Sequence, residues 1–386
     1  MMKKIKKFNS KIIHGGHGAD FETGAVMPPI HLSSTFKQNS PGKFKYEYAR
    51  SANPTRDILE KLLCEIEDGD YGYAFSSGLA AINCLTDAMG SNYHIICSDD
   101  VYGGTRRLFD KVKNKNQNIE ITYLDLSKEN NWRGNIKDST KMVWIETPSN
   151  PLLKIIDINK IKSNIEDTGI KIICDNTFAS PYNQQPLNQG ADVAIHSSTK
   201  YLGGHSDLIG GAIIIKNNNE LAEHIKFLQN AIGSIPSPFD CYMLIRSIKT
   251  LSVRMERHNY NGLEIANFLS KHQKIKKVFY PGLKSDPNYE NAKKQMNGFG
   301  GIVSIELNTD LNGTKKFLEN IEIFTLAESL GGVESLIEHP GIMTHSSIDK
   351  KIREEIGISD NLLRLSIGIE DVEDLKKVLD DALNLI

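Results

Sequence analysis

The chain has 386 residues, of which 39% are hydrophobic and 24% charged, and this balance suits two globular domains or one large domain with a smaller one. The formal net charge of −2 gives no indication of a nucleic-acid or membrane-surface partner. No run of 18 apolar residues is present, so no transmembrane helix is expected. The basic start, MMKKIKKFNSK, is not followed by an apolar segment, so a secretory signal is not expected either.

The five cysteines are far apart and form no Cys-X-X-Cys pair. This spacing is typical of reduced thiols in a cytosolic protein, so a cytoplasmic location is expected. Cys84, Cys97 and Cys174 have apolar neighbours and are expected to act as small buried hydrophobic residues. The stretch HGGHG (14–18) lacks acidic or thiol partners at ligand spacing, so no metal site is predicted.

Residues 1–52 are rich in Gly, Pro and Ser without helical periodicity, which predicts an extended N-terminal arm. Residues 53–69 predict a helix with Asn53 as N-cap, Pro54 at its first position and Gly69 at its end. Its apolar stripe consists of Ile58, Leu59, Leu62, Leu63 and Ile66.

Five short apolar runs follow, and each ends in a polar cluster. They are YGYAFSSG (71–78), HIICSDDVYGG (94–104), KMVWIETPSN (141–150), KIICDNTFAS (171–180) and DVAIHSSTK (192–200). Helix-compatible segments separate most of them, which predicts a mostly parallel, doubly wound α/β sheet. Ligands of such sheets bind at the carboxyl ends of the strands, where these polar clusters would gather.

A long helix-like stretch over about 241–272 leads into mixed strands and helices, which predicts a second, smaller α/β domain. Its stripe of Leu244, Ile248, Leu251 and Met255 predicts a helix that faces the core. The expected organisation is therefore an arm (1–52), a large domain (53–250) and a small C-terminal domain (251–386).

The Ser-Ser-Gly turn at 76–78 comes just before a predicted helix. Helix N-termini bind phosphate well, although Ser and Gly are also ordinary capping residues. The sequence has neither a GxGxxG motif after the first strand nor a P-loop, so dinucleotide and nucleotide-triphosphate sites are unsupported.

Asp175 and Lys200 each end an apolar strand. A lysine at that edge can be desolvated, which lowers its pKa and makes the amine nucleophilic. Hydroxyls at Ser197 and Thr199 could hold a phosphate, and Tyr102 supplies an aromatic face. Pyridoxal phosphate needs a lysine, an acid at its pyridine nitrogen and an anion site, so this combination predicts that cofactor. The alternative is a set of unconnected polar residues at strand ends.

Eight stretches together resemble the pyridoxal-phosphate enzymes of cysteine and methionine metabolism. They are YEYARSANPTR, SSGLAA, DDVYGGT, IETPSNP, DNTF, HSSTKYLGGHSD, LAESLGGVESL and LLRLSIGIED. The family includes cystathionine γ-synthases, γ-lyases and β-lyases and methionine γ-lyases. The resemblance implies the aspartate-aminotransferase-like α/β fold (fold type I) and a homotetramer of dimers that share active sites.

The same resemblance implies roles for the residues that match its motifs. Lys200 resembles the lysine that binds the cofactor covalently, Asp175 the acid at the pyridine nitrogen, and Tyr102 the stacked tyrosine that can act as a base. The remaining cofactor contacts implied are Gly78 and Leu79 through backbone N–H groups, Thr177, Ser197 and Thr199, with Tyr48 and Arg50 reaching the phosphate from the neighbouring subunit. The groups implied for the amino-acid substrate are Asn150, Glu328, Ser329 and Arg364.

The choice of reaction within the family rests on fewer residues. Gly104 stands where methionine γ-lyases have a cysteine, and LAESLGG lacks the aromatic residues common in enteric β-lyases. The stretch IPSPFDCY (235–242) is most similar to γ-lyases, whereas Glu328 is shared with many γ-synthases. The expected reaction is α,γ-elimination of L-cystathionine, with β-elimination, including release of sulfide, as a side activity. Cystathionine γ-synthase and β-lyase remain alternatives, and intact Lys200 and Asp175 argue against a scaffold without catalysis.

Overall fold

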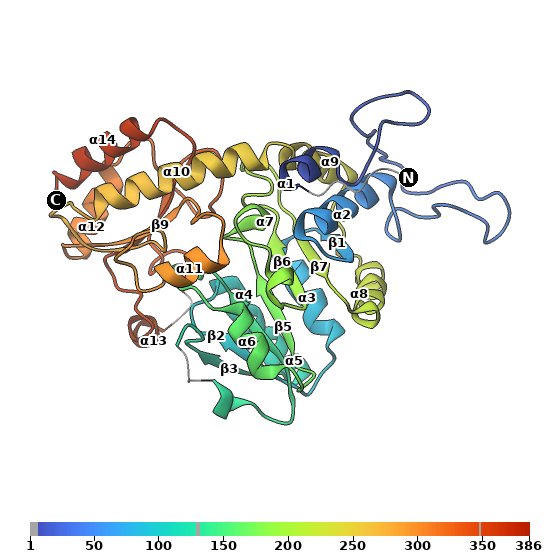
Figure 1. Cartoon of the computed structure of the whole chain (residues 1–386), viewed down its shortest axis with the longest axis horizontal. Coiled ribbons are helices and arrows are strands. Elements are labelled where there is room, and N and C mark those ends of the chain that lie inside the picture. Colours follow the sequence, from blue (N-terminus) through green and yellow to red (C-terminus); the bar gives the residue numbers. More distant parts are fainter. Residues whose placement is uncertain (1–6, 129–131, 347–348) are drawn as a thin grey trace.

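A seven-stranded sheet organises the larger part of the chain in this computed structural model, which describes residues 7–128, 132–346 and 349–386 (Figure 1). Residues 1–6 of the basic start lie outside these ranges. The strands are β1 (Tyr71–Phe75), β2 (His94–Ser98), β3 (Glu120–Leu124), β4 (Thr140–Glu146), β5 (Lys171–Asp175), β6 (Val193–Ser197) and β7 (Gly211–Ile215). Their order is β1-β7-β6-β5-β4-β2-β3, and only β7 runs antiparallel to its neighbours. This mostly parallel sheet confirms the predicted α/β class.

The five predicted strands correspond to β1, β2, β4, β5 and β6, whereas β3 and β7 were missed. β3 is an edge strand whose side chains are mostly half-buried, so its apolar signal is weak. β7 follows β6 without an intervening helix, because an antiparallel strand needs no helical crossover. The expected strand-helix alternation therefore passes over it.

Helices cover both faces of this sheet. They are α2 (Pro54–Glu67), α3 (Gly78–Ala88), α4 (Gly103–Leu108), the π-helix η1 (Phe109–Lys113), α5 (Asn114–Gln117), the short η2 (Arg133–Asn135), α6 (Ile158–Ile165), α7 (Ser180–Asn183), η3 (Pro186–Gln189) and α8 (Asn219–Ile232). Successive strand residues enter different cores: Ile172 packs with α2 and α6, and Ile173 packs with α3 and α8. This alternation is the doubly wound arrangement predicted from the sequence.

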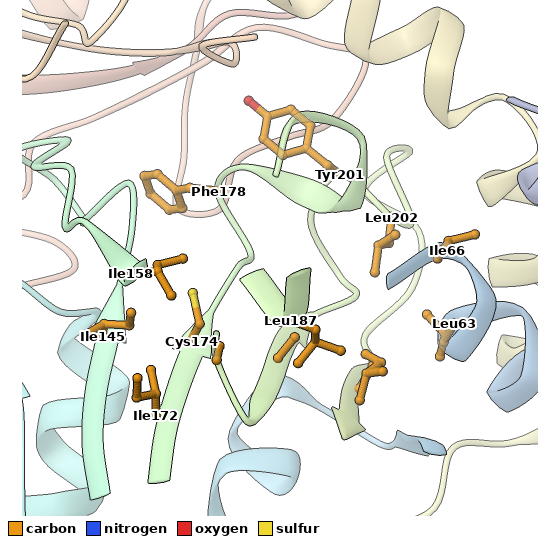
Figure 2. Close-up of a cluster of buried hydrophobic side chains, with 14 of the residues drawn as sticks. Leu63, Ile66, Ile145, Ile158, Ile172, Cys174, Phe178, Leu187, Tyr201 and Leu202 are labelled. Carbon is orange, nitrogen blue, oxygen red and sulfur yellow. The ribbon is translucent and has the colours of Figure 1, made fainter. Parts of the chain in front are cut away.

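Helix α2 begins as predicted, with the Asn53 side chain accepting hydrogen bonds from the N–H groups of Thr55 and Arg56. Its end differs from the prediction, because Asp68, with φ of 60°, takes the left-handed position assigned to Gly69. Figure 2 shows Leu63 and Ile66 of α2 in one buried cluster with side chains of the central strands.

The predicted long helix is two helices, α9 (Pro238–Ile248) and α10 (Leu251–Leu269), with a break at 249–250. The four stripe residues are nevertheless all buried, as predicted. Helix α10 runs from beside α9 to a second sheet (Figure 1).

The second sheet has the order β10-β11-β12-β9-β8 and is antiparallel except between β10 and β11. Its strands are β8 (Ile275–Phe279), β9 (Ile302–Leu307), β10 (Thr325–Leu326), β11 (Leu336–Glu338) and β12 (Leu362–Ser366). The helices of this part are α11 (Tyr289–Gln295), α12 (Leu311–Asn320), α13 (Lys350–Glu355) and α14 (Val372–Leu383). A separate hydrophobic core joins this sheet to α10, α12 and α14. The division of the chain at residue 250 remains a prediction.

The N-terminal arm is not extended throughout. Its helix α1 (Phe8–His14) buries Ile12 against α2, which the sequence analysis missed. Residues 15–52 contain neither a helix nor a strand, and they loop outward from the body beside α2 (Figure 1). Phe21 and Leu32 in these loops are exposed, at 101% and 71%.

Cys84, Cys97 and Cys174 are free and buried, which confirms their prediction as core residues. Within the described ranges, no helix is both long and apolar enough to cross a membrane.

Candidate active site

A cavity of about 420 Å³ lies at the carboxyl ends of β4, β5 and β6. The predicted residues that line it are Gly78, Leu79, Tyr102, Asn150, Asp175, Thr177, Ser197, Thr199, Lys200, Glu328, Ser329 and Arg364. Strand register explains part of this gathering, because Glu146 pairs with Asp175 and Asp175 pairs with Ile195 on the next strand. Tyr48 and Arg50 are the two predicted residues outside the cavity lining.

Asp175 is a buried carboxylate at the end of β5. Thr177 donates two hydrogen bonds to its Oδ1, from the backbone N at 3.1 Å and from Oγ1 at 2.6 Å. Burial raises the pKa of Asp175, and the Thr177 hydrogen bonds oppose that rise. Since both bonds use Oδ1, they fix the carboxyl group without occupying Oδ2.

Lys200 follows β6, and its Nζ donates a hydrogen bond of 2.6 Å to Ser329 Oγ. Burial, with a smaller contribution from the nearby Arg364 guanidinium, lowers the pKa of the Lys200 amine to about 8, against opposing effects of Glu338 and Glu328. Near neutral pH, a much larger fraction of this amine is therefore neutral and nucleophilic than of a lysine with the ordinary pKa of 10.5. Ser329 itself has φ of 89°, an uncommon conformation for a residue with a side chain.

The N-terminus of α3 faces the same cavity. Ser77 caps the helix by accepting from Ala80 N at 3.0 Å, while the first-turn N–H groups of Gly78 and Leu79 have no intrahelical acceptor. A Cβ at Gly78 would lie 2.9 Å from Ser197 Cβ, so only glycine lets the helix end approach the β6 hydroxyls this closely. Together with Thr199 Oγ1, these groups form a cradle suited to a phosphate.

The ring of Tyr102 is positioned by the backbone on either side of it. Its own N–H donates to Glu146 Oε2 at 2.9 Å, and a Cβ at Gly104 would lie only 2.3 Å from the tyrosine Cε1. A Cβ at Gly103 would lie 2.4 Å from Thr344 O. Gly104 therefore allows the ring to fold back over the start of α4, and Gly103 allows the start of this helix to approach the backbone of Thr344.

Arg364 enters the cavity from β12 of the second sheet. Its Nη1 donates to Asn150 Oδ1 at 2.9 Å, its Nη2 donates to Ser329 O at 2.7 Å, and Glu338 Oε1 is an ion-pair partner at 3.0 Å from Nη1. This guanidinium is thus held in one orientation, as required of a group that binds a carboxylate by two hydrogen bonds.

Residues of the site that were not identified from the sequence include Glu146, Phe178, Glu338 and Thr344. Glu146 ends β4 as Asp175 ends β5, so the strand-end rule could have found it. Glu338 and Thr344 reach the site through the pairing of β11 with β12 and through a loop, and neither has a signal in the local sequence.

Tyr48 and Arg50 lie in the arm, where the chain turns at 48–52 and is not extended as expected. The Arg50 guanidinium lies 5.5 Å from the centre of the Tyr48 ring, and its Nη1 donates to Asn230 O at 2.7 Å. The two side chains therefore lie together, apart from the cavity of their own chain.

A larger cleft of about 1020 Å³ lies elsewhere on the chain, between residues such as Asp125 and Glu306. It contains none of the predicted site residues, and its charged groups are largely neutralised by pairs such as Lys154 with Asp99. Size alone is thus a poor guide to the active site here.

The cavity around Lys200 provides a nucleophilic amine, a buried carboxylate, an aromatic ring and a phosphate cradle. This donor set fits pyridoxal phosphate: Lys200 would hold its aldehyde, Asp175 its pyridine nitrogen and the α3 cradle its phosphate. The fold and the site together define a pyridoxal-phosphate enzyme of fold type I.

Comparisons with known proteins lead to the same class. Residues 9–384 match the family described as "Cys/Met metabolism PLP-dependent enzyme", and the chain belongs to this family. It is 52% identical to a cystathionine β-lyase of Lactococcus lactis subsp. cremoris, over 98% of this chain and 99% of the relative.

Two solved structures are also closely similar. A cystathionine γ-lyase of Lactobacillus plantarum, complexed with L-serine, superposes with a TM-score of 0.95 at 44% identity, over 98% of this chain and 99% of the other. A cystathionine γ-synthase of Xanthomonas oryzae pv. oryzae gives a TM-score of 0.95 at 40% identity, over 99% and 98%. Because the relatives carry three different activities, the chain is assigned to the cystathionine lyase and synthase group.

The depressed pKa of Lys200 can be measured in the cofactor-free protein by competitive labelling with trace acetic anhydride. An amine reacts only when it is deprotonated, so labelling of Lys200 should be half-maximal near pH 8, below the ordinary lysine value of 10.5. Lys350 is an internal control, because its hydrogen bond to Asp360 raises its pKa. A Lys200 profile centred at or above 10.5 would show that burial does not set its reactivity.

Proposed function

We propose that the protein is a cystathionine γ-lyase, which splits L-cystathionine with water into L-cysteine, 2-oxobutyrate and ammonia. The observation that carries this proposal is the cavity that combines the low-pKa amine of Lys200, the carboxyl group of Asp175 and the fixed guanidinium of Arg364. These are the groups needed to activate an amino acid and to hold its α-carboxylate.

Bound pyridoxal phosphate supplies an electron sink that stabilises negative charge at the substrate α-carbon. Asp175 keeps a proton on the pyridine nitrogen, which strengthens that sink. Lys200 Nζ would move protons between the α- and β-carbons of the substrate. Its contact with Ser329 Oγ supports this role, since it places the amine beside the substrate-binding loop.

The cavity contains groups suited to the α-carboxylate, the amine and the distal ammonium group of the substrate. The carboxylate is bound by Arg364, Asn150 and Ser329. Because these groups already contact one another, the substrate has little to rearrange when it binds. Tyr102 could accept a proton from the incoming amine only in its ionised form, which burial disfavours and Arg107 favours. Exposed Glu328 lines the cavity, where it can meet the distal ammonium group.

A second candidate function is β-elimination, which yields homocysteine, pyruvate and ammonia. It is favoured by the name of the Lactococcus relative, at 52% identity. The γ-lyase proposal is favoured by the stretch LAESLGG, which lacks the aromatic residues common in enteric β-lyases. γ-Synthase remains an alternative, because its substrates would use the same carboxylate-binding groups.

The products of the purified holoenzyme distinguish these reactions. With L-cystathionine alone we expect 2-oxobutyrate and cysteine in equal amounts, at least about tenfold faster than pyruvate. Mass spectrometry of the keto acids after derivatisation measures the ratio, and Lys200→Ala is the matched blank. Predominant pyruvate with homocysteine would replace the proposal by β-lyase. Rapid formation of cystathionine from cysteine and an O-acyl-homoserine, without cleavage, would replace it by γ-synthase.

We further propose that the arm completes the active site of a neighbouring subunit in a homotetramer. Tyr48 and Arg50 would then contact the cofactor phosphate of that neighbour. Their position outside their own cavity supports this arrangement, as does the exposure of Phe21 and Leu32 in the loops around them.

A hybrid dimer tests the shared site. Arg50→Ala and Lys200→Ala should each lose most activity, while a hybrid of the two contains one site with both residues intact. Co-expression with two affinity tags and sequential purification should give a hybrid with about half the wild-type activity. Arg246→Ala, at the C-terminal end of α9, takes the place of Arg50→Ala in the control hybrid. A verified hybrid no more active than its parents would refute the shared site.

A further inference from the structure

The guanidinium of Arg364 has five N–H donors, and two of them make hydrogen bonds to the protein. Nη1 donates to Asn150 Oδ1 and Nη2 donates to Ser329 O, while Glu338 Oε1 is the ion-pair partner of Nη1 at 3.0 Å. The buried Nε–H has no partner among the described residues. Apart from Nη1, which lies between Asn150 and Glu338, the guanidinium keeps Nε–H and one hydrogen of Nη2, and the Nε and Nη2 atoms share one edge of the planar group.

Glu338 lies beside Nη1 of Arg364, away from the edge formed by Nε and Nη2. Both side chains are almost fully buried, at 1% for Glu338 and 2% for Arg364, and their residues are register partners on β11 and β12. Thr344 Oγ1 donates to Glu338 Oε1 at 3.0 Å, which fixes the carboxylate further. A buried carboxylate is costly unless it is paired, so the pair is a strong constraint on where Arg364 can lie.

We propose that Glu338 is a positioning residue for substrate binding: it takes up Nη1 of Arg364, so that the substrate α-carboxylate binds side-on, to the edge formed by Nε and Nη2. This inference rests on the proposed role of Arg364 in binding the substrate carboxylate. It adds that Glu338 orients the guanidinium and that the carboxylate binds to the Nε and Nη2 edge. Without an acceptor at position 338, Nη1 would compete with Nε for the substrate carboxylate. The guanidinium could then turn and present Nη1 and Nη2 to the carboxylate.

The proposal separates two effects of Glu338. Its Oε1 acts as an acceptor that orients Arg364, and this effect favours the substrate carboxylate. Its negative charge repels the same carboxylate, and burial makes that repulsion stronger than it would be in water. Removing the acceptor and removing the charge should therefore change carboxylate binding in opposite directions.

The test measures the contribution of the carboxylate alone, in the holoenzyme. Glycine and methylamine differ only by that group, and binding of each is followed by the change in the visible spectrum of the cofactor. The ratio of their dissociation constants, methylamine over glycine, reports carboxylate recognition. A loss of stability or of general cofactor geometry would affect both ligands and leave the ratio unchanged.

Four variants make the test specific. Glu338→Ala should lower the ratio at least about tenfold, because the guanidinium loses its anchor. Glu338→Asp retains the charge but withdraws the acceptor from Nη1, so it should lower the ratio as well, and it replaces the alanine variant if that protein does not fold. Glu338→Gln keeps an acceptor without the charge, so its ratio should equal or exceed that of the wild type. In Arg364→Lys the ratio should fall toward one, because a lysine cannot donate two parallel hydrogen bonds to a carboxylate.

The outcomes distinguish this inference from the proposed function. If Arg364→Lys loses carboxylate recognition while Glu338→Ala and Glu338→Asp retain it, the positioning role is wrong and the role of Arg364 stands. A lower ratio in Glu338→Gln than in the wild type would also overturn the inference. If Arg364→Lys retains the ratio, Arg364 is not the carboxylate-binding group, and the proposed function fails at that residue.

Discussion

The desolvation of one amine is the constraint on which the site depends. Lys200 is half-buried without a direct ion-pair partner among the described residues, and the hydroxyl of Ser329 is its hydrogen-bond acceptor. Burial favours the neutral amine, which lowers its pKa toward neutral pH, and Arg364 reinforces the effect. A nearer carboxylate would stabilise the ammonium form and remove the nucleophile. The surrounding hydroxyls and glycines are therefore a requirement of the chemistry, because they supply polarity without charge.

The site joins the two sheets, and this division separates its functions. The groups that fit the cofactor come from the large sheet and α3, at the carboxyl ends of adjacent parallel strands. The groups that we assign to the substrate carboxylate come mainly from the second sheet, through β12 and the loop at Ser329. The contact of Arg364 with Asn150 connects the two sets. Substrate binding would thus act on the junction of the two parts of the chain.

The sequence was most informative where local chemistry and backbone period agree. Short apolar runs that end in Asp175 and in the Ser197 to Lys200 cluster identified buried parallel strands and the edge at which their polar residues meet. The family resemblance added Arg364, Ser329 and Asn150, which no local pattern would have brought to the cavity. The sequence analysis missed β7 because an antiparallel strand breaks the strand-helix alternation. It missed Glu338 because this residue reaches Arg364 through the pairing of β11 with β12. Such residues depend on tertiary contacts that a single sequence does not encode locally.

Lys200 is the residue to which we assign the cofactor, and chemical fixation tests this assignment most directly. The purified holoenzyme is reduced with borohydride, which makes the link between cofactor and protein permanent, and is then digested and mapped by mass spectrometry. We predict a single pyridoxyl phosphate group, on the peptide that contains Lys200, together with loss of the visible absorbance. Attachment to any other lysine, or no attachment in a protein that holds the cofactor, would contradict the account.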